Sequence, residues 1–421
     1  MIVRTVLDNG IRLLTEDVPA VESVSIGLWV SCGARDENVA LNGVSHFIEH
    51  MLFKGTQSRS AYDIASQIEV TGGHINACTG KENTSYYLKL PEYHLTLGLE
   101  ILADMVINPA FDCSEIENEK SVVLSEISQL EDTPEEYIHD IFEASFWQEN
   151  PLGLPILGSR ESVHNFTDSA IREFFSARYN ASNILISIAV AIDQQKTIRL
   201  VEDIFGSLAT PNGTIPTRKE NFAAPKHFRT LQQRKTQQLN VLIGSPAFGA
   251  TNPQRYTMAV LNAVLGGTMS SRLFQEVREK RGLAYSIGSF FLPYSDSGIF
   301  CTFVGTSCDN FYKVVSCCAD EYKKMEMEIL SAKELSNAKE MLKGGFLLSM
   351  EGTDARMNIM ARNENNFSRQ LAPAEIMQGI DAVSAEGVRN LASNILSPQN
   401  NSILVLGKMK DSNFQKAMSL F

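Results

Sequence analysis

The side chains best suited to catalysis lie near the start of the chain, where His46, Glu49 and His50 form a His-x-x-Glu-His string. The surrounding pattern predicts a helix with Asn42 as its N-cap and Gly55 as its stop. On such a helix the three side chains share one face. Two imidazoles one turn apart can bind one zinc ion, and the carboxylate beside them can take a proton from water. Chance produces such a string in roughly one chain of this size in a hundred.

A catalytic zinc ion needs a third protein ligand and one open position. The acidic segment 115–127 offers candidates, and among them Glu119 and Glu126 are seven residues apart and project from nearly the same helix face. One of the two could bind metal while the other supports it. Spacing alone does not choose between them, and a solvated acidic helix explains the same residues.

The elements that position these residues are both helices and strands, and the two do not alternate strictly along the chain. Apolar periodicity and terminal signals predict long helices over 92–107, 114–131 and 135–147, and strands over 23–30, 184–191 and 239–243. The expected class is therefore α+β, with two similar domains, each a mostly antiparallel sheet flanked by helices.

A Pro- and Gly-rich stretch over 209–227 predicts a linker between these domains. The expected division is a metal-binding domain over 1–208 and a second domain over 228–421. The order of elements restarts after the linker, which indicates a duplication. The segment 261–265, which corresponds to the first-half zinc helix, has neither His nor Glu, so only the first half is expected to hold metal.

The composition bounds the class of protein. The chain has 421 residues, 44% hydrophobic and 20% charged, as in a globular protein that needs no membrane. Its net charge of -12 disfavours nucleic acid and anionic membranes and favours cationic peptides. Seven cysteines without CxxC spacing, and a start that lacks a signal-peptide pattern, predict a reducing, cytoplasmic location.

The string from His46 to Thr56 resembles the signature of the inverted zinc-binding metallopeptidases, the pitrilysin family that includes insulysin and the mitochondrial processing peptidase. The resemblance runs nearly end to end. The family's spacing from the second histidine falls on Glu126, which the resemblance thus implies as third ligand of one zinc ion per chain. Glu119 matches the family's other recurrent glutamate, which implies a supporting role behind the ligands.

Two further segments resemble parts of the family that bind substrate. The segment 72–79 is similar to an edge strand on which a peptide is added as a β-strand, with Asn76 and Ala77 lining the cleft. The segment 278–285 resembles one in which an Arg and a Tyr, here Arg278 and Tyr285, reach the substrate backbone. On local evidence alone, the segment 72–79 also fits an ordinary hairpin edge, and the segment 278–285 an ordinary basic helix end followed by a strand.

The resemblance also implies a substrate class. Glu136 and Asp140, four residues apart on one predicted helix face, match positions that read a basic side chain in the processing peptidase. One chain carries both the zinc residues and the Arg/Tyr pair, as in short bacterial members, which implies a homodimer.

The expected function is that of a zinc-dependent endopeptidase acting on short or unfolded, extended and cationic peptides inside a closed chamber. The alternative is a non-catalytic binding or scaffold subunit, although such relatives usually lose a ligand or the base. A purely structural zinc site would need a fourth ligand and would leave Glu49 without a task.

Overall fold

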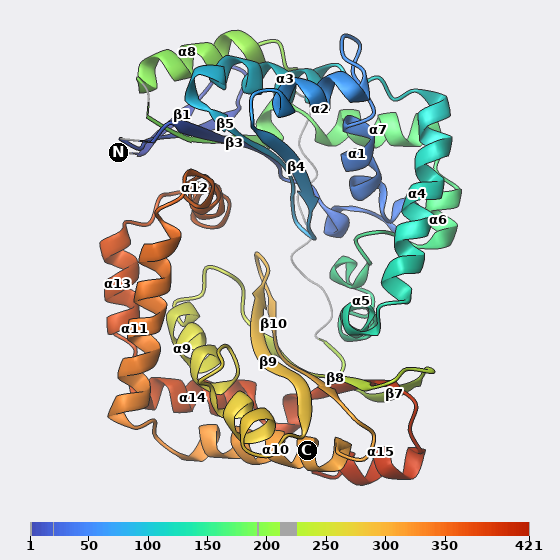
Figure 1. The fold of residues 1–421 in the computed structure, drawn as a ribbon, viewed down its shortest axis with the longest axis vertical. Helices are drawn as coiled ribbons and strands as arrows, with labels where there is room; N and C mark the ends of the chain where they lie inside the picture. Colours follow the sequence, from blue (N-terminus) through green and yellow to red (C-terminus); the bar gives the residue numbers. More distant parts are fainter. Residues whose placement is uncertain (1, 20, 192, 211–224, 421) are drawn as a thin grey trace. The chain divides into compact units, whose positions relative to one another are not determined.

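The computed structural model describes residues 2–19, 21–191, 193–210 and 225–420 (Figure 1). By its contacts the chain divides into two compact units, neither of which is continuous in sequence. The first unit comprises Met1–Gln129, Leu154–Lys219 and Ser349–Gln370, and the second comprises Leu130–Gly153, Glu220–Leu348 and Leu371–Phe421.

The first unit is built on a six-stranded sheet in the order β1-β2-β6-β3-β5-β4. All neighbours are antiparallel except β2 and β6, which pair in parallel. β6 is buried along its whole length, as expected for an apolar run at the centre of a sheet. β4 lies at the edge, so one side of its backbone pairs with no strand among the described residues. The strands are β1 Ile2–Val6, β2 Arg12–Asp17, β3 Ser23–Val30, β4 His74–Thr79, β5 Thr84–Pro91 and β6 Ile184–Val190.

Helices cover one face of this sheet and enclose the larger apolar core of the unit, with α3 and α8 side by side above the strands in Figure 1. The helices of this layer are α1 Val44–Leu52, α2 Ala61–Glu69, α3 Leu95–Ile107, α4 Cys113–Glu131, α6 Arg160–His164, α7 Asp168–Arg178 and α8 Gln194–Phe205. Short 3₁₀ turns join them at Ala34–Asp36, Val39–Leu41, Glu92–His94 and Ala181–Asn183.

The opposite face of the first sheet is covered by α12 (Thr353–Phe367), which comes from far along the chain (Figure 1). Met357 and Met360 of α12 are buried against Trp29 of β3. Glu364, one turn further along the same helix face, is buried and lies 3.0 Å from Arg4 of β1. Apolar burial and a charge pair therefore fix α12 to this sheet.

The second unit has a five-stranded sheet in the order β7-β11-β8-β10-β9, with β7 and β11 parallel and the other pairs antiparallel. Its strands are β7 Arg229–Gln233, β8 Leu239–Ala247, β9 Ala284–Pro293, β10 Gly298–Thr306 and β11 Ser402–Gly407. The order β11-β8-β10-β9 repeats β6-β3-β5-β4 of the first sheet, so the two units share a strand plan.

One face of the second sheet packs on most of the helices of this unit, and the other packs on α5 alone among its α-helices. Phe142 and Phe146 of α5 are buried against Leu242 of β8. The helices are α5 Pro134–Phe146, α9 Arg255–Leu265, α10 Phe311–Met327, α11 Ala332–Ser349, α13 Pro373–Asp381, α14 Ala385–Ile395 and α15 Asp411–Met418. The 3₁₀ turns Pro151–Gly153 and Pro398–Asn400 and the π-helical turn Phe274–Glu279 complete the unit.

The expected α+β class with two mostly antiparallel sheets and flanking helices is confirmed. The structure differs from a single division of the chain at 209–227, because α5 precedes that segment yet belongs to the second unit, and α12 follows it yet belongs to the first. Residues 211–224 of the expected linker lie outside the described residues. Among the described residues, no helix combines the length and apolarity needed to cross a bilayer.

Candidate metal centre

The helix α1 presents two chemically different faces. Phe47, Ile48 and Met51 are fully buried in the core of the first unit and hold the helix in place. His46 and His50 lie on another face, with ring centroids 4.4 Å apart. The two histidines therefore share one helix face, as predicted.

The N-terminus of α1 corrects the expectation that Asn42 is the N-cap. The N-cap is Gly43, with a φ of 92° that favours glycine, and it has no side chain to bond the helix. The buried carboxylate of Glu37 does this instead, accepting hydrogen bonds from the backbone nitrogens of Gly43 (2.6 Å) and Ser45 (2.8 Å). Asn42 donates its side-chain amide to the same carboxylate at 3.0 Å. Burial raises the pKa of Glu37 to about 7, although these hydrogen bonds oppose the shift.

The C-terminus of α1 also differs from the prediction. The helix ends at Leu52 with Phe53 as its C-cap, before Gly55. Gly55 still marks the change of direction, because its φ of 124° belongs to the region that glycine tolerates, and its backbone bridges to Ser60.

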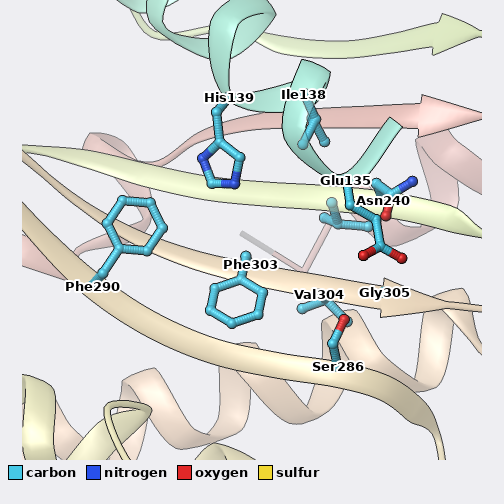
Figure 2. A pocket seen from close by; sticks show the side chains of 10 residues that line it. Glu135, Ile138, His139, Asn240, Ser286, Phe290, Phe303, Val304 and Gly305 are labelled. Atoms are coloured by element: carbon cyan, nitrogen blue, oxygen red, sulfur yellow. The ribbon is translucent and has the colours of Figure 1, made fainter. Parts of the chain in front are cut away.

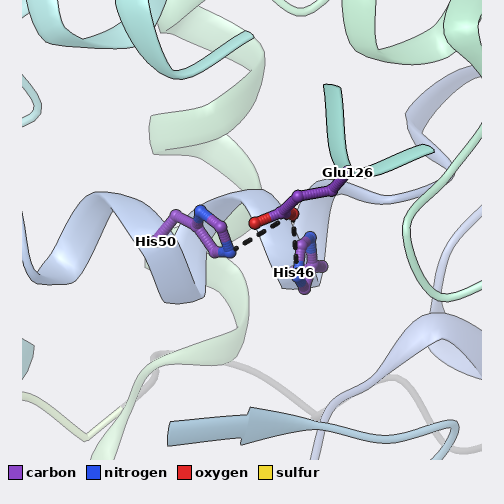
Figure 3. Close-up of side chains that lie close together, drawn as sticks. All are labelled: His46, His50 and Glu126. Atoms are coloured by element: carbon purple, nitrogen blue, oxygen red, sulfur yellow. Dashed lines mark ion pairs between the residues drawn. The ribbon is translucent and has the colours of Figure 1, made fainter. Parts of the chain in front are cut away.

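The helix α4 brings Glu126 to the two histidines (Figure 3). One ligand atom from each of the three residues lies within 4.8 Å of the others. Glu126 Oε2 is 3.9 Å from His46 Nε2 and 3.7 Å from His50 Nε2, and Figure 3 shows the carboxylate directed at both rings. No other group of three His, Cys, Asp or Glu side chains within the described ranges converges in this way.

Glu119 lies behind His50 and does not face the same point as Glu126. Its Oε1 is 2.7 Å from His50 Nδ1. A carboxylate only accepts hydrogen bonds, so Nδ1 carries the proton and the lone pair of Nε2 is left facing Glu126. Lys54 Nζ lies 2.6 Å from Glu119 Oε2 and balances its buried charge. This geometry separates the roles of the two glutamates, which spacing left open.

The electrostatics differ between the two histidines. Burial, with His50 nearby, lowers the pKa of His46 to about 4, so its imidazole is neutral near pH 7. Burial also lowers the pKa of His50, but the hydrogen bond to Glu119 and the charges of Glu126, Glu119 and Glu49 raise it more, and the net shift is upward. A metal cation bound between the two rings would take the place of the proton that these carboxylates favour on His50.

Glu49 is held by the edge strand β4. The hydroxyl of Thr79 donates a hydrogen bond to Glu49 Oε2. Burial raises the pKa of Glu49, while the bonds from Thr79 and the charge of His50 oppose that shift. The carboxylate is thus fixed beside the two histidines and is not among the three converging ligand atoms.

The donor set fits a zinc ion. Zinc–ligand bonds of about 2.0–2.2 Å in a tetrahedron place ligand atoms about 3.3–3.6 Å apart, close to the separations found here. Glu126 Oε2 is a buried atom without a hydrogen-bond partner among the described residues, although a carboxylate oxygen in such a place needs one. Two imidazole nitrogens and one carboxylate oxygen leave one tetrahedral position open, as catalytic zinc sites do.

The predicted substrate-binding residues fall in both units. Asn76 and Ala77 lie on β4 of the first unit, where Asn76 is exposed at the free edge of the sheet. Arg278 lies in the π-helical turn, 4.9 Å from the ring of Phe274, and Tyr285 is an 84% exposed residue of β9. These two side chains belong to the second unit.

Glu136 and Asp140, the predicted readers of a basic side chain, both lie on α5. Glu136 is exposed and Asp140 is half-buried. The helix α5 also belongs to the second unit.

Sequence analysis missed three residues that support this centre, namely Glu37, Lys54 and Thr79. Thr79 ends the edge strand that the family resemblance indicated, so the sequence pointed to this position, but it did not predict the hydrogen bond to Glu49. Glu37 precedes the helix by several residues, and no local capping pattern connects it to the N-terminus of α1. Such contacts depend on how the chain folds back.

We predict that Glu119→Gln weakens zinc binding about 10- to 100-fold, because an amide no longer fixes the His50 tautomer or balances its charge. Competition with a chromophoric chelator would measure the affinity. Glu117→Gln is the matched control, since Glu117 is a solvent-exposed residue of the same helix that pairs with Lys120. Equal affinities for the two variants would contradict the support assigned to Glu119.

Comparison with known proteins agrees with this geometry. A family model described as Insulinase (Peptidase family M16) matches residues 12–160, and one described as Peptidase M16 inactive domain matches residues 165–342. The three converging side chains of His46, His50 and Glu126 lie in the first of these matches. The second match fits a half of the chain in which α9 carries neither His nor Glu.

Relatives and solved structures match over nearly the whole chain. Proteins named uncharacterized zinc proteases from Streptomyces coelicolor and Bacillus subtilis (YmxG) are each 36% identical, over 97% and 94% of this chain and 90% and 96% of theirs. A protease from Helicobacter pylori has a similar fold, with a TM-score of 0.88, 19% identity and 96% and 99% of the two chains covered. The resemblance seen in the sequence is thereby confirmed: this chain belongs to peptidase family M16, the insulinase family.

Proposed function

We propose that this chain is a zinc-dependent endopeptidase with one zinc ion per chain, held by His46, His50 and Glu126. The observation that carries the proposal is the convergence of these three ligand atoms within 4.8 Å, with a second carboxylate, Glu49, on the helix α1 that holds the two histidines. Membership of a peptidase family and relatives named zinc proteases support it. A bound zinc ion would supply a Lewis acid that polarises the scissile carbonyl and activates water.

Glu49 acts as the general base in this proposal. It accepts a proton from the attacking water and then delivers that proton to the leaving amine. Its partial burial and its hydrogen bond from Thr79 keep the carboxylate in one orientation beside the ligands. Oε2 of Glu49 accepts the hydrogen bond from Thr79, so Oε1 is the oxygen assigned to accept the proton of the water.

The substrate binds as an added strand on the free edge of β4. Peptides bound in this way gain backbone hydrogen bonds irrespective of sequence, and alternate side chains point to either side. Thr79, at one end of β4, contacts Glu49, so a peptide paired with β4 runs toward the base. Asn76 and Ala77 are the β4 residues assigned to contact it. Only extended segments can pair with an edge, which favours short or unfolded peptides as substrates.

Arg278 and Tyr285 are assigned to the substrate backbone and to the oxyanion that develops at the scissile bond. Both carry hydrogen-bond donors suited to such a charge, and Tyr285 is exposed. The rival function is a non-catalytic binding or scaffold subunit. The presence of the complete set of ligands and base favours the enzyme, and a turnover measurement separates the two.

Chelation should abolish peptide cleavage, and added zinc should restore it, because the ligands form an open site. Glu49→Gln should keep zinc at wild-type stoichiometry but lower kcat by about 10²- to 10⁴-fold through loss of the base. Cleavage of quenched fluorescent peptides, paired with metal analysis of the same samples, measures both. A Glu49→Gln protein that cleaves at the wild-type rate would refute the assignment, and a chain without any zinc-dependent turnover would point to the binding subunit.

We further propose a preference for cleavage near Arg or Lys, read by Glu136 and Asp140 of α5. Their two negative charges and the net charge of -12 favour cationic peptides. A peptide library should show a basic preference that falls at least severalfold in the double variant Glu136→Gln, Asp140→Asn. A profile without basic preference, or one that the double variant leaves unchanged, would be the contrary result.

The closed chamber that family resemblance implies requires two copies of a chain of this length, so we propose a homodimer. Light scattering of the purified full chain should therefore give twice the mass of 46.6 kDa. A monomer at all concentrations tested would oppose both the dimer and the chamber. All seven cysteines are free, which supports the cytoplasmic location proposed here, and cell fractionation would test it.

A further inference from the structure

The second unit contains a cavity of about 290 Å³ between α5 and the sheet strands β8, β9 and β10 (Figure 2). All ten residues that line it belong to this unit. One wall is a turn of α5. The other is the part of the facing sheet surface that α5 does not cover. Gly305 of β10 contributes only backbone there, and a Cβ at that position would lie 2.6 Å from the Ser286 hydroxyl.

One end of the cavity is aromatic. The imidazole of His139 lies 5.6 Å from the ring of Phe290, and the ring of Phe290 lies 6.4 Å from that of Phe303, measured between centroids. Both phenylalanines are partly exposed, so their rings are available to a ligand. Figure 2 shows the three rings on one side of the cavity. Tilted rings at these distances form a favourable wall for another aromatic ring.

The other end is polar. Glu135, Asn240 and Ser286 present their oxygen and nitrogen atoms there, as Figure 2 shows. Gln238 donates a hydrogen bond to Glu135 Oε1, which orients the carboxylate. Asn240 is only 4% exposed, yet its Nδ2 has no hydrogen-bond partner among the described residues. A buried amide without a partner is costly in a folded protein, and a ligand that accepts its hydrogen bond would explain it.

The charges around the cavity narrow the ligand class. No Lys or Arg side chain lines it, and Glu135 is the one carboxylate that does. Burial lowers the pKa of His139, so the imidazole is neutral near pH 7. Anionic side chains are therefore disfavoured. The tip of a fitting ligand must accept a hydrogen bond from Asn240 Nδ2 and donate one to Glu135.

We propose that this cavity is a specificity site for a tyrosine side chain of a bound peptide. The ring packs against Phe290 and Phe303, and the phenol oxygen accepts from Asn240 Nδ2 while its O–H donates to Glu135. The identity of the ligand as a peptide rests on the proposed peptidase function. Phenylalanine fits the aromatic end but leaves Asn240 unpartnered. Arginine and lysine carry only donors at their tips, so they leave Asn240 Nδ2 unpartnered as well.

The test uses the full-length Glu49→Gln protein, which binds without cleaving, and three peptides that differ at one position, carrying Tyr, Phe or Arg. Isothermal titration calorimetry should show the Tyr peptide binding about 5- to 10-fold more tightly than the Phe peptide, the gain of two hydrogen bonds. Asn240→Ala should lower the Tyr preference to about 2- to 3-fold, because the hydrogen bond from the phenol to Glu135 remains. It should change Tm little, because the Nδ2 that is lost has no hydrogen-bond partner among the described residues. Asn390→Ala, on the exposed side of α14, is the control that should keep the Tyr preference.

Equal affinities for the Tyr and Phe peptides in the Glu49→Gln protein would overturn the proposal. A Tyr preference that Asn240→Ala leaves undiminished would overturn it too. So would an Arg peptide that binds more tightly than the Tyr peptide and loses that advantage in Asn240→Ala. Glu135→Gln provides a second variant, because it keeps an acceptor but removes the charge and should reduce the Tyr preference about 2- to 5-fold. These readouts need no turnover, so they can fail while zinc-dependent cleavage stands, and the reverse is equally possible.

Discussion

The hydrogen bond between His50 Nδ1 and Glu119 is the interaction on which the metal centre depends. It connects α1 with α4, fixes the proton on one ring nitrogen and directs the other toward Glu126. Without it, neither the tautomer nor the rotation of the His50 ring would be determined. Lys54 makes the arrangement possible, since a carboxylate as buried as that of Glu119 needs a nearby cation. The chemistry of one helix therefore relies on two residues that bind neither metal nor substrate.

The sequence was most informative where function follows from spacing on one element. The shared face of His46 and His50 needs only the periodicity of a helix, and the structure places their ring centroids 4.4 Å apart. Choosing Glu126 over Glu119 needed the family resemblance, because both project from α4 on similar sides. The N-terminus of α1 could not be predicted, since Glu37 reaches it through a fold of the intervening chain. Local capping rules pointed to Asn42, which bonds Glu37 instead of the helix.

The exchange of helices between the units was beyond sequence reasoning for a different reason. The pattern of Met357, Met360 and Ala361 shows that α12 has an apolar stripe, but a stripe does not name the sheet that it covers. Each sheet needs a helix on the face opposite its main helical layer, and the choice depends on contacts such as that of Glu364 with Arg4. The division into units follows from these pairings and not from the position of the Pro- and Gly-rich segment.

The exchange has a consequence for how this protein can be dissected. A fragment that stops at residue 208 would retain the complete ligand set but lose α12, and Leu14, Trp29 and Leu185 would face water on an open sheet. The same fragment would carry α5, whose Phe142 and Phe146 would lose the strand residues Leu242, Leu404 and Leu406 of their cluster. Exposed apolar faces of this kind favour aggregation. The fragment 1–208 is therefore not expected to fold stably by itself, and a truncation must keep α12 with the first sheet and α5 with the second.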